Sequence, residues 1–156
     1  MVMTTDQSYS IRPYQPADQA QVMHLLQLNT PTYFAPEEEA DLLHYLHHEL
    51  EEYFVVEYQD KVVGCGGINF SEDKHTGKIS WDILHPEYQG KGLGSQLLQF
   101  RISRLQSLEQ VEHITVRTSQ LVYPFYEKNG FALVEVVKDY WAPGFDLYSM
   151  RYTGKI

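Results

Sequence analysis

A glycine-rich segment in the middle of the chain has the residue types and spacing to hold phosphate groups. It reads Gln89-Gly90-Lys91-Gly92-Leu93-Gly94-Ser95, and it lies between a strand-like stretch and a helical pattern. The first N–H groups of a helix have no partner within the helix, and the helix dipole favours an anion there. Glycines let a phosphate approach the backbone without meeting a Cβ atom, and the lysine adds positive charge. The segment therefore predicts a phosphate-binding turn.

Two common nucleotide-binding loops do not fit this segment. A dinucleotide-binding fingerprint that starts at Gly90 requires a third glycine where Ser95 stands. The Walker loop requires Ser or Thr after Gly-Lys, and Gly92 occupies that position. The pattern that does fit is Gln-x-x-Gly-x-Gly. A glycine-rich turn that only caps a helix is the alternative.

This pattern resembles the pyrophosphate-binding motif of the Gcn5-related N-acetyltransferases (GNATs). Residues 125–131, Phe-Tyr-Glu-Lys-Asn-Gly-Phe, resemble the segment that these enzymes carry after their fifth strand. Lys61–Gly64 and Leu84–Glu87 are similar to the family's third strand and to the exit from its fourth strand. The matches occur in the family's order from Ile11–Pro13 to the last strand, so the resemblance covers nearly the whole chain.

The resemblance implies a fold, a co-substrate and a binding mode. The fold is α/β (α+β), with a mixed, mostly antiparallel seven-stranded sheet that splays between strands 4 and 5 and is flanked by about four helices. Acetyl-coenzyme A (acetyl-CoA) would lie in the splay, its pantetheine arm hydrogen-bonded like an added strand near Ile83 and Leu84. A backbone N–H near Leu84 would stabilise the oxyanion of acyl transfer. The implied cofactor-binding residues are Ile83, Leu84, Gln89, Gly90, Lys91, Gly92, Leu93, Gly94, Ser95 and Ser119, the last of which stands where the family often has asparagine.

Acetylation of an amine requires one group that accepts a proton and one that donates a proton. A lysine-like amine has a pKa of about 10.4 and must lose a proton before it attacks, while the departing thiolate gains one. The resemblance implies that Tyr126 is the general acid, since tyrosine keeps its proton at neutral pH. Asp82, two residues before Leu84 and on the same face of a strand, is the candidate general base. Simple packing of Tyr126 and solvation of Asp82 stay open as alternatives.

Two pairs of aromatic residues are candidates for the acceptor site. The resemblance places Tyr33-Phe34 and Tyr140-Trp141 in loops around the acceptor slot, and core packing explains them equally well. Lys78 stands where histone acetyltransferases of the family carry a glutamate base, which argues against a histone acceptor. The expected activity is direct acetyl transfer to a primary amine of a small molecule or peptide. The alternatives are a protein N-terminal or lysine acetyltransferase and a non-catalytic acetyl-CoA sensor.

The rest of the sequence predicts the elements that position this site in one domain over residues 1–156. Apolar residues at helical spacing predict helices over 16–28 and about 37–52. Strand-like runs separated by turn residues predict an antiparallel meander and further strands around a short helix. The predicted strands cover residues 8–13, 53–58, 61–70, 78–84, 113–118, 131–137 and 145–152, and the later helices cover 92–108 and 124–129. This order indicates a mixed sheet with helices packed on it.

Composition restricts the classes of partner. The 156 residues carry a formal net charge of −9, which would repel a nucleic acid and is compatible with a cationic acceptor. The single cysteine, Cys65, forms no internal disulfide and suits a reducing cytoplasm. The first ten residues lack the pattern of a signal peptide, and the apolar runs are too short to span a bilayer, so we expect a cytoplasmic protein without membrane contact. We expect no metal, because His44 and His48 lack a third ligand; a homodimer stays open.

Overall fold

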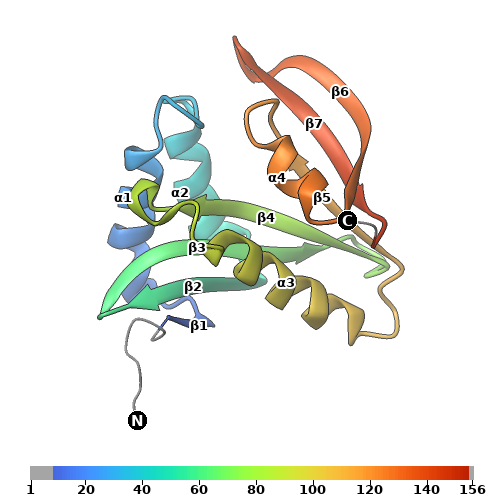
Figure 1. Cartoon of the computed structure of the whole chain (residues 1–156), viewed down its shortest axis with the longest axis horizontal. Coiled ribbons are helices and arrows are strands. Elements are labelled where there is room, and N and C mark those ends of the chain that lie inside the picture. Colours follow the sequence, from blue (N-terminus) through green and yellow to red (C-terminus); the bar gives the residue numbers. More distant parts are fainter. Residues whose placement is uncertain (1–8, 155–156) are drawn as a thin grey trace.

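The computed structural model describes residues 9–154. Within this range seven strands form one sheet in the order β1-β2-β3-β4-β5-β7-β6, and helices pack around it (Figure 1). Neighbouring strands are antiparallel except for β4 and β5, which run parallel. The prediction of a mixed, mostly antiparallel α/β sheet is confirmed.

The elements follow the predicted order along the chain. The strands are β1 (Ser10–Pro13), β2 (Glu52–Tyr58), β3 (Lys61–Phe70), β4 (Thr76–Leu84), β5 (His113–Thr118), β6 (Phe131–Ala142) and β7 (Phe145–Tyr152). The helices are α1 (Gln19–Leu28), α2 (Glu38–His48), α3 (Leu93–Gln106) and α4 (Tyr123–Lys128), with 3₁₀ helices η2 (Pro16–Asp18) and η3 (Pro86–Tyr88). Ser8, with which the first predicted strand begins, lies outside the described residues.

Apolar side chains on both faces of the sheet form the core. On one face, Leu26 of α1 and Leu42 of α2 belong to the same buried cluster as Val55 of β2. On the other face, Leu98 and Ile102 of α3 pack with residues of the central strands. Each fully buried side chain of this kind stabilises the fold by about 1.5–3 kcal/mol relative to its exposed state. The two helical layers therefore hold the middle of the sheet from both sides.

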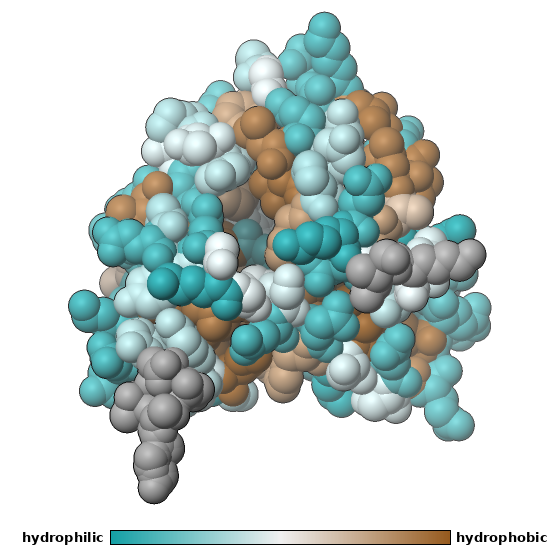
Figure 2. Space-filling model, viewed as in Figure 1, coloured by the Kyte–Doolittle hydropathy of each residue, from teal (hydrophilic) through white to brown (hydrophobic). Residues whose placement is uncertain are grey.

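The sheet splays between β4 and β5. Their parallel pairing runs from Thr76 opposite His113 to Ile79 opposite Val116, and it stops there. Beyond this point β5, β7 and β6 turn away from β4 (Figure 1), and the space-filling view shows a hollow between the two sides (Figure 2). The predicted splay is confirmed. Within the described chain, residues 80–84 of β4 have no strand on that edge.

Two predicted boundaries are wrong by several residues. Helix α2, which we expected to run to about Glu52, ends at His48, because Glu52 already pairs with Ile68 in the sheet. Strand β6, which we expected to end at Val137, continues to Ala142, because it pairs with β7 up to a tight turn. A long hairpin therefore takes the place of the loop that the sequence indicated.

Two further predictions concern membrane contact and a homodimer. No helix within residues 9–154 is long and apolar enough to cross a membrane. Leu133, Val134 and Val136 on the edge strand β6 are exposed apolar side chains. A homodimer stays a prediction.

Candidate active site

The glycine-rich segment forms an open turn at the N-terminus of α3. Gly90 and Gly92 have φ angles of +81° and +82°, in the left-handed region that favours glycine. A Cβ atom at either residue would meet no atom of the described chain within 4 Å, so the turn faces open space. Gly92 is the N-cap of α3 and has no side chain to cap the first N–H groups. These groups are therefore available to an anion.

Gly94 serves a different purpose from the other two glycines. A Cβ atom there would lie 3.3 Å from ring atoms of Phe125 in α4. The neighbouring Ser95 accepts a hydrogen bond from Asn129 Nδ2 at 3.3 Å, and the same amide donates to the Phe125 carbonyl at 2.8 Å. The small residues thus let α4, which carries Tyr126, approach the glycine turn closely.

A cavity of about 390 Å³ joins the glycine turn to β4 and α4. We call it the turn cavity. The predicted cofactor-binding residues that line it are Ile83, Leu84, Gln89, Gly90, Gly92, Gly94 and Ser95. The other three lie elsewhere, since Lys91 is exposed, Leu93 is buried in the core, and Ser119 lines a second cavity.

The backbone of Leu84 faces the splay. The His85 N–H donates to the Val63 carbonyl at 2.8 Å, so the backbone groups of His85 point toward β3. Because successive residues of an antiparallel strand point their N–H and C=O groups to opposite edges, those of Leu84 point away from β3. The Leu84 carbonyl accepts a hydrogen bond from Asn29 Nδ2 at 3.0 Å, and Gln89 Nε2 donates to Asn29 Oδ1 at 3.4 Å. Asn29, which the sequence analysis missed, therefore ties the turn to the free edge of β4.

Asp82 and Tyr126 are in direct contact, and a buried arginine completes the group. The Tyr126 hydroxyl donates a hydrogen bond to Asp82 Oδ2, and Arg101 Nη2 forms an ion pair with Asp82 Oδ1. Arg101 is fully buried, with Nη1 donating to the Gly67 carbonyl at 3.0 Å and Nε to the Leu97 carbonyl at 3.2 Å. A buried guanidinium is tolerated only when it is paired and hydrogen-bonded. The ion pair with Asp82 is therefore one of the contacts that allow Arg101 to be buried.

A β-bulge puts Asp82 on the face of the sheet that α3 covers. Cys65 pairs with Ile83 and Gly67 with Ser80, so two residues of β4, Trp81 and Asp82, face one residue of β3. Trp81 has a φ of +48°, and its carbonyl accepts a hydrogen bond from Tyr53 at 2.9 Å. Ile79 already packs on the α3 side, so regular alternation would send Asp82 to the opposite face.

The room for this ion pair comes from the strand opposite the bulge. A Cβ atom at Gly66 would collide with Asp82 Oδ1 and would lie 2.8 Å from Arg101 Nη1. Leu84 packs with residues of α3 as well, so the prediction that Asp82 and Leu84 share a face is confirmed.

Burial governs the protonation of two groups in the turn cavity. Burial first, and then the charge and hydrogen bond of Asp82, raise the pKa of Tyr126 well above its usual value, so its hydroxyl keeps its proton at neutral pH. Burial also raises the pKa of the Cys65 thiol to about 12. Cys65 lines the same cavity, but a thiol is a poor nucleophile until it ionises. Cys65 is therefore not suited to carry an acyl group.

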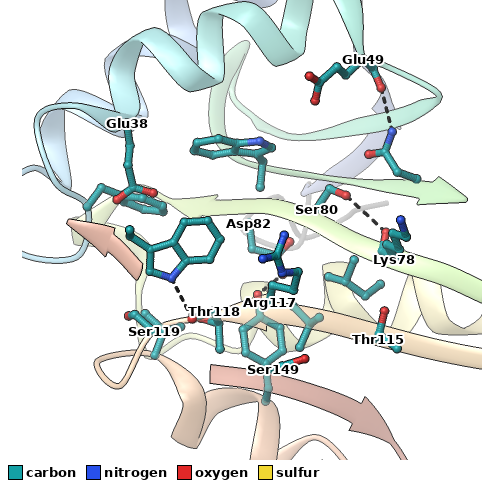
Figure 3. Close-up of a pocket in the computed structure, with 18 of the residues that line it drawn as sticks. Glu38, Glu49, Lys78, Ser80, Asp82, Thr115, Arg117, Thr118, Ser119 and Ser149 are labelled. Atoms are coloured by element: carbon teal, nitrogen blue, oxygen red, sulfur yellow. Dashed lines mark hydrogen bonds between the residues drawn. The ribbon is translucent and has the colours of Figure 1, made fainter. Parts of the chain in front are cut away.

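A second cavity, of about 830 Å³, is also lined by Asp82 and Tyr126. Figure 3 shows this cavity, with Asp82 labelled. We call it the acceptor cavity. Its walls come from α2, β4, β5 and the β6–β7 hairpin. The two cavities share part of their lining, namely Tyr33, Phe34, Asp82, Val122 and Tyr126. They therefore meet at the pair of groups that the sequence analysis selected for acid–base chemistry.

The predicted acceptor-site aromatics differ in their positions. Tyr33 and Phe34 line both cavities, and Phe34 stacks on Trp81 with ring centroids 6.2 Å apart. Trp141 lines the acceptor cavity, with Nε1 donating to the Thr118 carbonyl at 3.0 Å. Tyr140 is half exposed and lies outside both linings. Tyr140 and Trp141 belong to β6, not to the loop in which we expected them.

The histidines of α2 make other contacts. His44 Nε2 lies 3.2 Å from Glu49 Oε2, and both side chains are largely exposed. Among residues 9–154, no group of three or more His, Cys, Asp or Glu side chains is placed to hold a metal ion.

Arg101 is the main site residue that sequence reasoning missed, although a signal was present. It lies four residues after Leu97 and four before Leu105, so it falls within the buried stripe of α3. A charged residue at that spacing indicates either a break in the stripe or a buried ion pair. Asn29 carries no comparable signal, because an asparagine at a helix end is common for local reasons.

Comparison with known proteins agrees with this fold. The sequence profile of the acetyltransferase (GNAT) family matches residues 20–131. A GNAT-family protein from Desulfovibrio desulfuricans has a TM-score of 0.76 at 22% identity, covering 92% of this chain and 98% of that one. A GNAT-family acetyltransferase from Elizabethkingia anophelis, solved with acetyl-CoA bound, has a TM-score of 0.70 at 17% identity, covering 94% and 98%.

Among curated proteins, the amino-acid acetyltransferase of Pasteurella multocida is 26% identical over 88 residues, which are 56% of this chain and 20% of that protein. The chain spans about a fifth of the length of the curated relatives that it matches first. The splayed sheet, the glycine turn and the profile match define an acetyltransferase fold. This chain belongs to the GNAT acetyltransferase family.

Proposed function

We propose that the chain is an acetyl-CoA-dependent N-acetyltransferase that moves the acetyl group directly onto a primary amine of a small molecule or peptide. The observation that carries the proposal is the meeting of the turn cavity and the acceptor cavity at Asp82 and Tyr126. A thioester in the first cavity and an amine in the second would come together there. Direct attack is supported further by Cys65, whose buried thiol is un-ionised.

The residues present fit acetyl-CoA. Gly90 and Gly92 leave the first N–H groups of α3 open to the pyrophosphate, and the free edge of β4 at Leu84 offers backbone groups to the amides of the pantetheine arm. When bound, acetyl-CoA supplies an activated thioester. The Leu84 N–H, which points into the splay, is the candidate donor for the oxyanion that develops during attack.

We propose complementary roles for the two contacting groups. The Asp82 carboxylate accepts the proton that the neutral amine loses as it attacks, and the Tyr126 hydroxyl gives its proton to the leaving sulfur. An acceptor that arrives as an ammonium first releases one further proton to solvent. Because the two groups are hydrogen-bonded, the proton on Asp82 then moves to the tyrosinate and resets the pair. The raised pKa of Tyr126 disfavours the tyrosinate and so favours this return. Arg101 keeps Asp82 in position from the buried side.

Acetyl-CoA is expected to raise the melting temperature, because a ligand that binds only the native state stabilises it by mass action. At 100 times the Kd the gain is about 2.7 kcal/mol, which corresponds to roughly 5–10 °C for a domain of this size. Differential scanning fluorimetry measures the shift, with a nicotinamide dinucleotide as the control that should give little. An unchanged melting temperature at millimolar acetyl-CoA would remove the cofactor assignment.

Gly92→Val is expected to weaken acetyl-CoA binding about 10–100-fold, because hydrogen bonds to a charged group typically contribute that much affinity. A branched side chain strains the positive φ and stands where phosphate oxygens must meet the N–H groups. Lys91→Ala removes an exposed charge and should weaken acetyl-CoA binding less than about fivefold. Titration calorimetry measures both dissociation constants.

Gly144→Val is the matched control, because Gly144 has a φ of +84° and equally open surroundings in the β6–β7 turn. This variant should lower the free energy of unfolding about as much as Gly92→Val does, and it should leave the acetyl-CoA Kd unchanged. Equal losses of affinity in the Gly92 and Gly144 variants would mean that the cradle lies elsewhere.

Two alternatives have some support. A non-catalytic acetyl-CoA sensor would keep the glycine turn but would not need the Asp82–Tyr126 contact, which favours the enzyme. The name of the Pasteurella multocida relative supports a small amine over a protein acceptor. A cytoplasmic location, without nucleic-acid or membrane partners, remains part of the proposal and is supported by the buried, unpaired Cys65.

A further inference from the structure

The acceptor cavity contains two cationic side chains from neighbouring strands. Lys78 of β4 pairs in register with Thr115 of β5, and Arg117 follows two residues later on the same face of β5. Both line the cavity, and within residues 9–154 neither has a carboxylate within ion-pair distance. Figure 3 shows Lys78 and Arg117 among the residues that line the cavity.

Arg117 is held in place by the β6–β7 hairpin. Its Nη2 donates to the Tyr140 hydroxyl at 2.6 Å, and its guanidinium lies 4.9 Å from the Tyr140 ring centroid and 5.6 Å from that of Trp141. Trp141 is fixed in turn by its bond to the Thr118 carbonyl. A guanidinium has five N–H donors, and this arrangement uses one of them. The remaining donors form a pre-oriented fork that suits a carboxylate.

The acidic residues on the α2 side of the cavity already have partners. Glu51 pairs with Lys74 at 3.5 Å, and Glu49 lies 3.2 Å from His44. Glu38 is buried, accepts the Ala35 N–H at 2.9 Å, and has its pKa raised by burial. None of these glutamates lies within ion-pair distance of Lys78 or Arg117, so both cationic groups stay available to a ligand, although the chain as a whole carries −9.

We infer that the acceptor is a primary amine that also carries a carboxylate, bound through that carboxylate by Arg117 with Lys78 beside it. This inference rests on the proposed acetyl transfer. Arg117 follows Val116, the last residue of β5 that pairs with β4, and both Arg117 and Asp82 line the acceptor cavity. An amine at Asp82 and a carboxylate at Arg117 therefore belong to one compact molecule or residue, such as an amino acid. Tyr140, which lies outside the cavity lining, acts by positioning Arg117.

The test uses pairs of amines that differ only in the carboxylate, such as lysine with cadaverine and ornithine with putrescine. Binding of each to the complex with CoA is measured by titration calorimetry, which requires no turnover. The carboxylated members should bind about 10–100-fold more tightly, and Arg117→Gln should abolish this preference. Arg117→Lys should restore part of it, since it keeps the charge and loses the fork. Arg104→Gln, on the exposed face of α3, is the matched control and should change nothing.

Each outcome decides the question. Equal binding of both members, preference for the decarboxylated amines, no binding by any carboxylated member, or a preference that survives Arg117→Gln would overturn the inference. If the inference fails, acetyl transfer to the decarboxylated amines in a thiol-release assay would still support the proposed function. Absence of acetyl-CoA binding would instead contradict the proposed function itself.

Discussion

Tyr126→Phe is expected to lower kcat by roughly 10²–10⁴-fold, the usual worth of general acid catalysis. The substitution keeps the ring in the buried cluster and deletes only the hydroxyl that contacts Asp82. The acetyl-CoA Kd should change little, because the phosphates and pantetheine are held by the glycine turn and β4. A parallel fall in kcat and kcat/KM, with that Kd preserved, identifies an interaction made in the transition state.

Tyr123→Phe is the matched control for this measurement. Tyr123 lies on the same helix and packs against Tyr148 with ring centroids 4.6 Å apart, but it lines neither cavity. Its variant should keep normal kinetics. If Tyr126→Phe also kept a near-normal kcat, the acid role would be refuted, and Tyr126 would be a packing residue whose hydroxyl only satisfies Asp82.

Arg101→Met is expected to destabilise the fold by about 3–5 kcal/mol, because it leaves the Asp82 carboxylate without its ion-pair partner inside the protein. Methionine fills much of the space of the arginine stem, so the loss reports mainly on the broken pair. Urea unfolding, extrapolated to water, measures the free energy of unfolding. Activity should fall as well, since Asp82 loses the group that orients it.

Two further variants separate the buried pair from a general effect of arginine. Arg104→Met removes an exposed arginine of the same helix, paired with Glu52 at 2.9 Å, and should cost less than about 1 kcal/mol. Adding Asp82→Asn to Arg101→Met removes the stranded charge and should recover part of the stability while activity stays low. Equal free energies for the Arg101 and Arg104 variants would show that the buried pair contributes little.

The glycine turn could be predicted from sequence because its requirements are local. A positive φ and an uncapped helix start depend on a few adjacent residues, and both leave a signature in glycine spacing. The hairpin turn at Gln59-Asp60 and the place of Pro124 near the start of α4 are local in the same way. Pro124 lies in the first turn of α4, where its missing N–H costs no helical bond.

The geometry around Asp82 could not be predicted, because it depends on contacts between distant segments. The bulge at Trp81 requires a positive φ from a tryptophan, which no local preference favours, and Tyr53 and Gly66 from two other strands make it possible. The burial of Arg101 likewise depends on Asp82 across the sheet. The position of Lys78 and Arg117 in one cavity, without an ion-pair partner in the described chain, is also non-local, since net charge does not show which cations lie together or which are paired.

The central claim is that this chain moves an acetyl group from acetyl-CoA directly to an amine, and mass spectrometry of a complete reaction tests it most directly. The protein is incubated with acetyl-CoA and a panel of amino acids, polyamines, aminoglycosides and peptides, while free thiol is followed. The account predicts one thiol released for each acetylated amine, with no acetyl group on the protein. Tight acetyl-CoA binding without thiol release for any amine, or an acetylated Cys65, would contradict it.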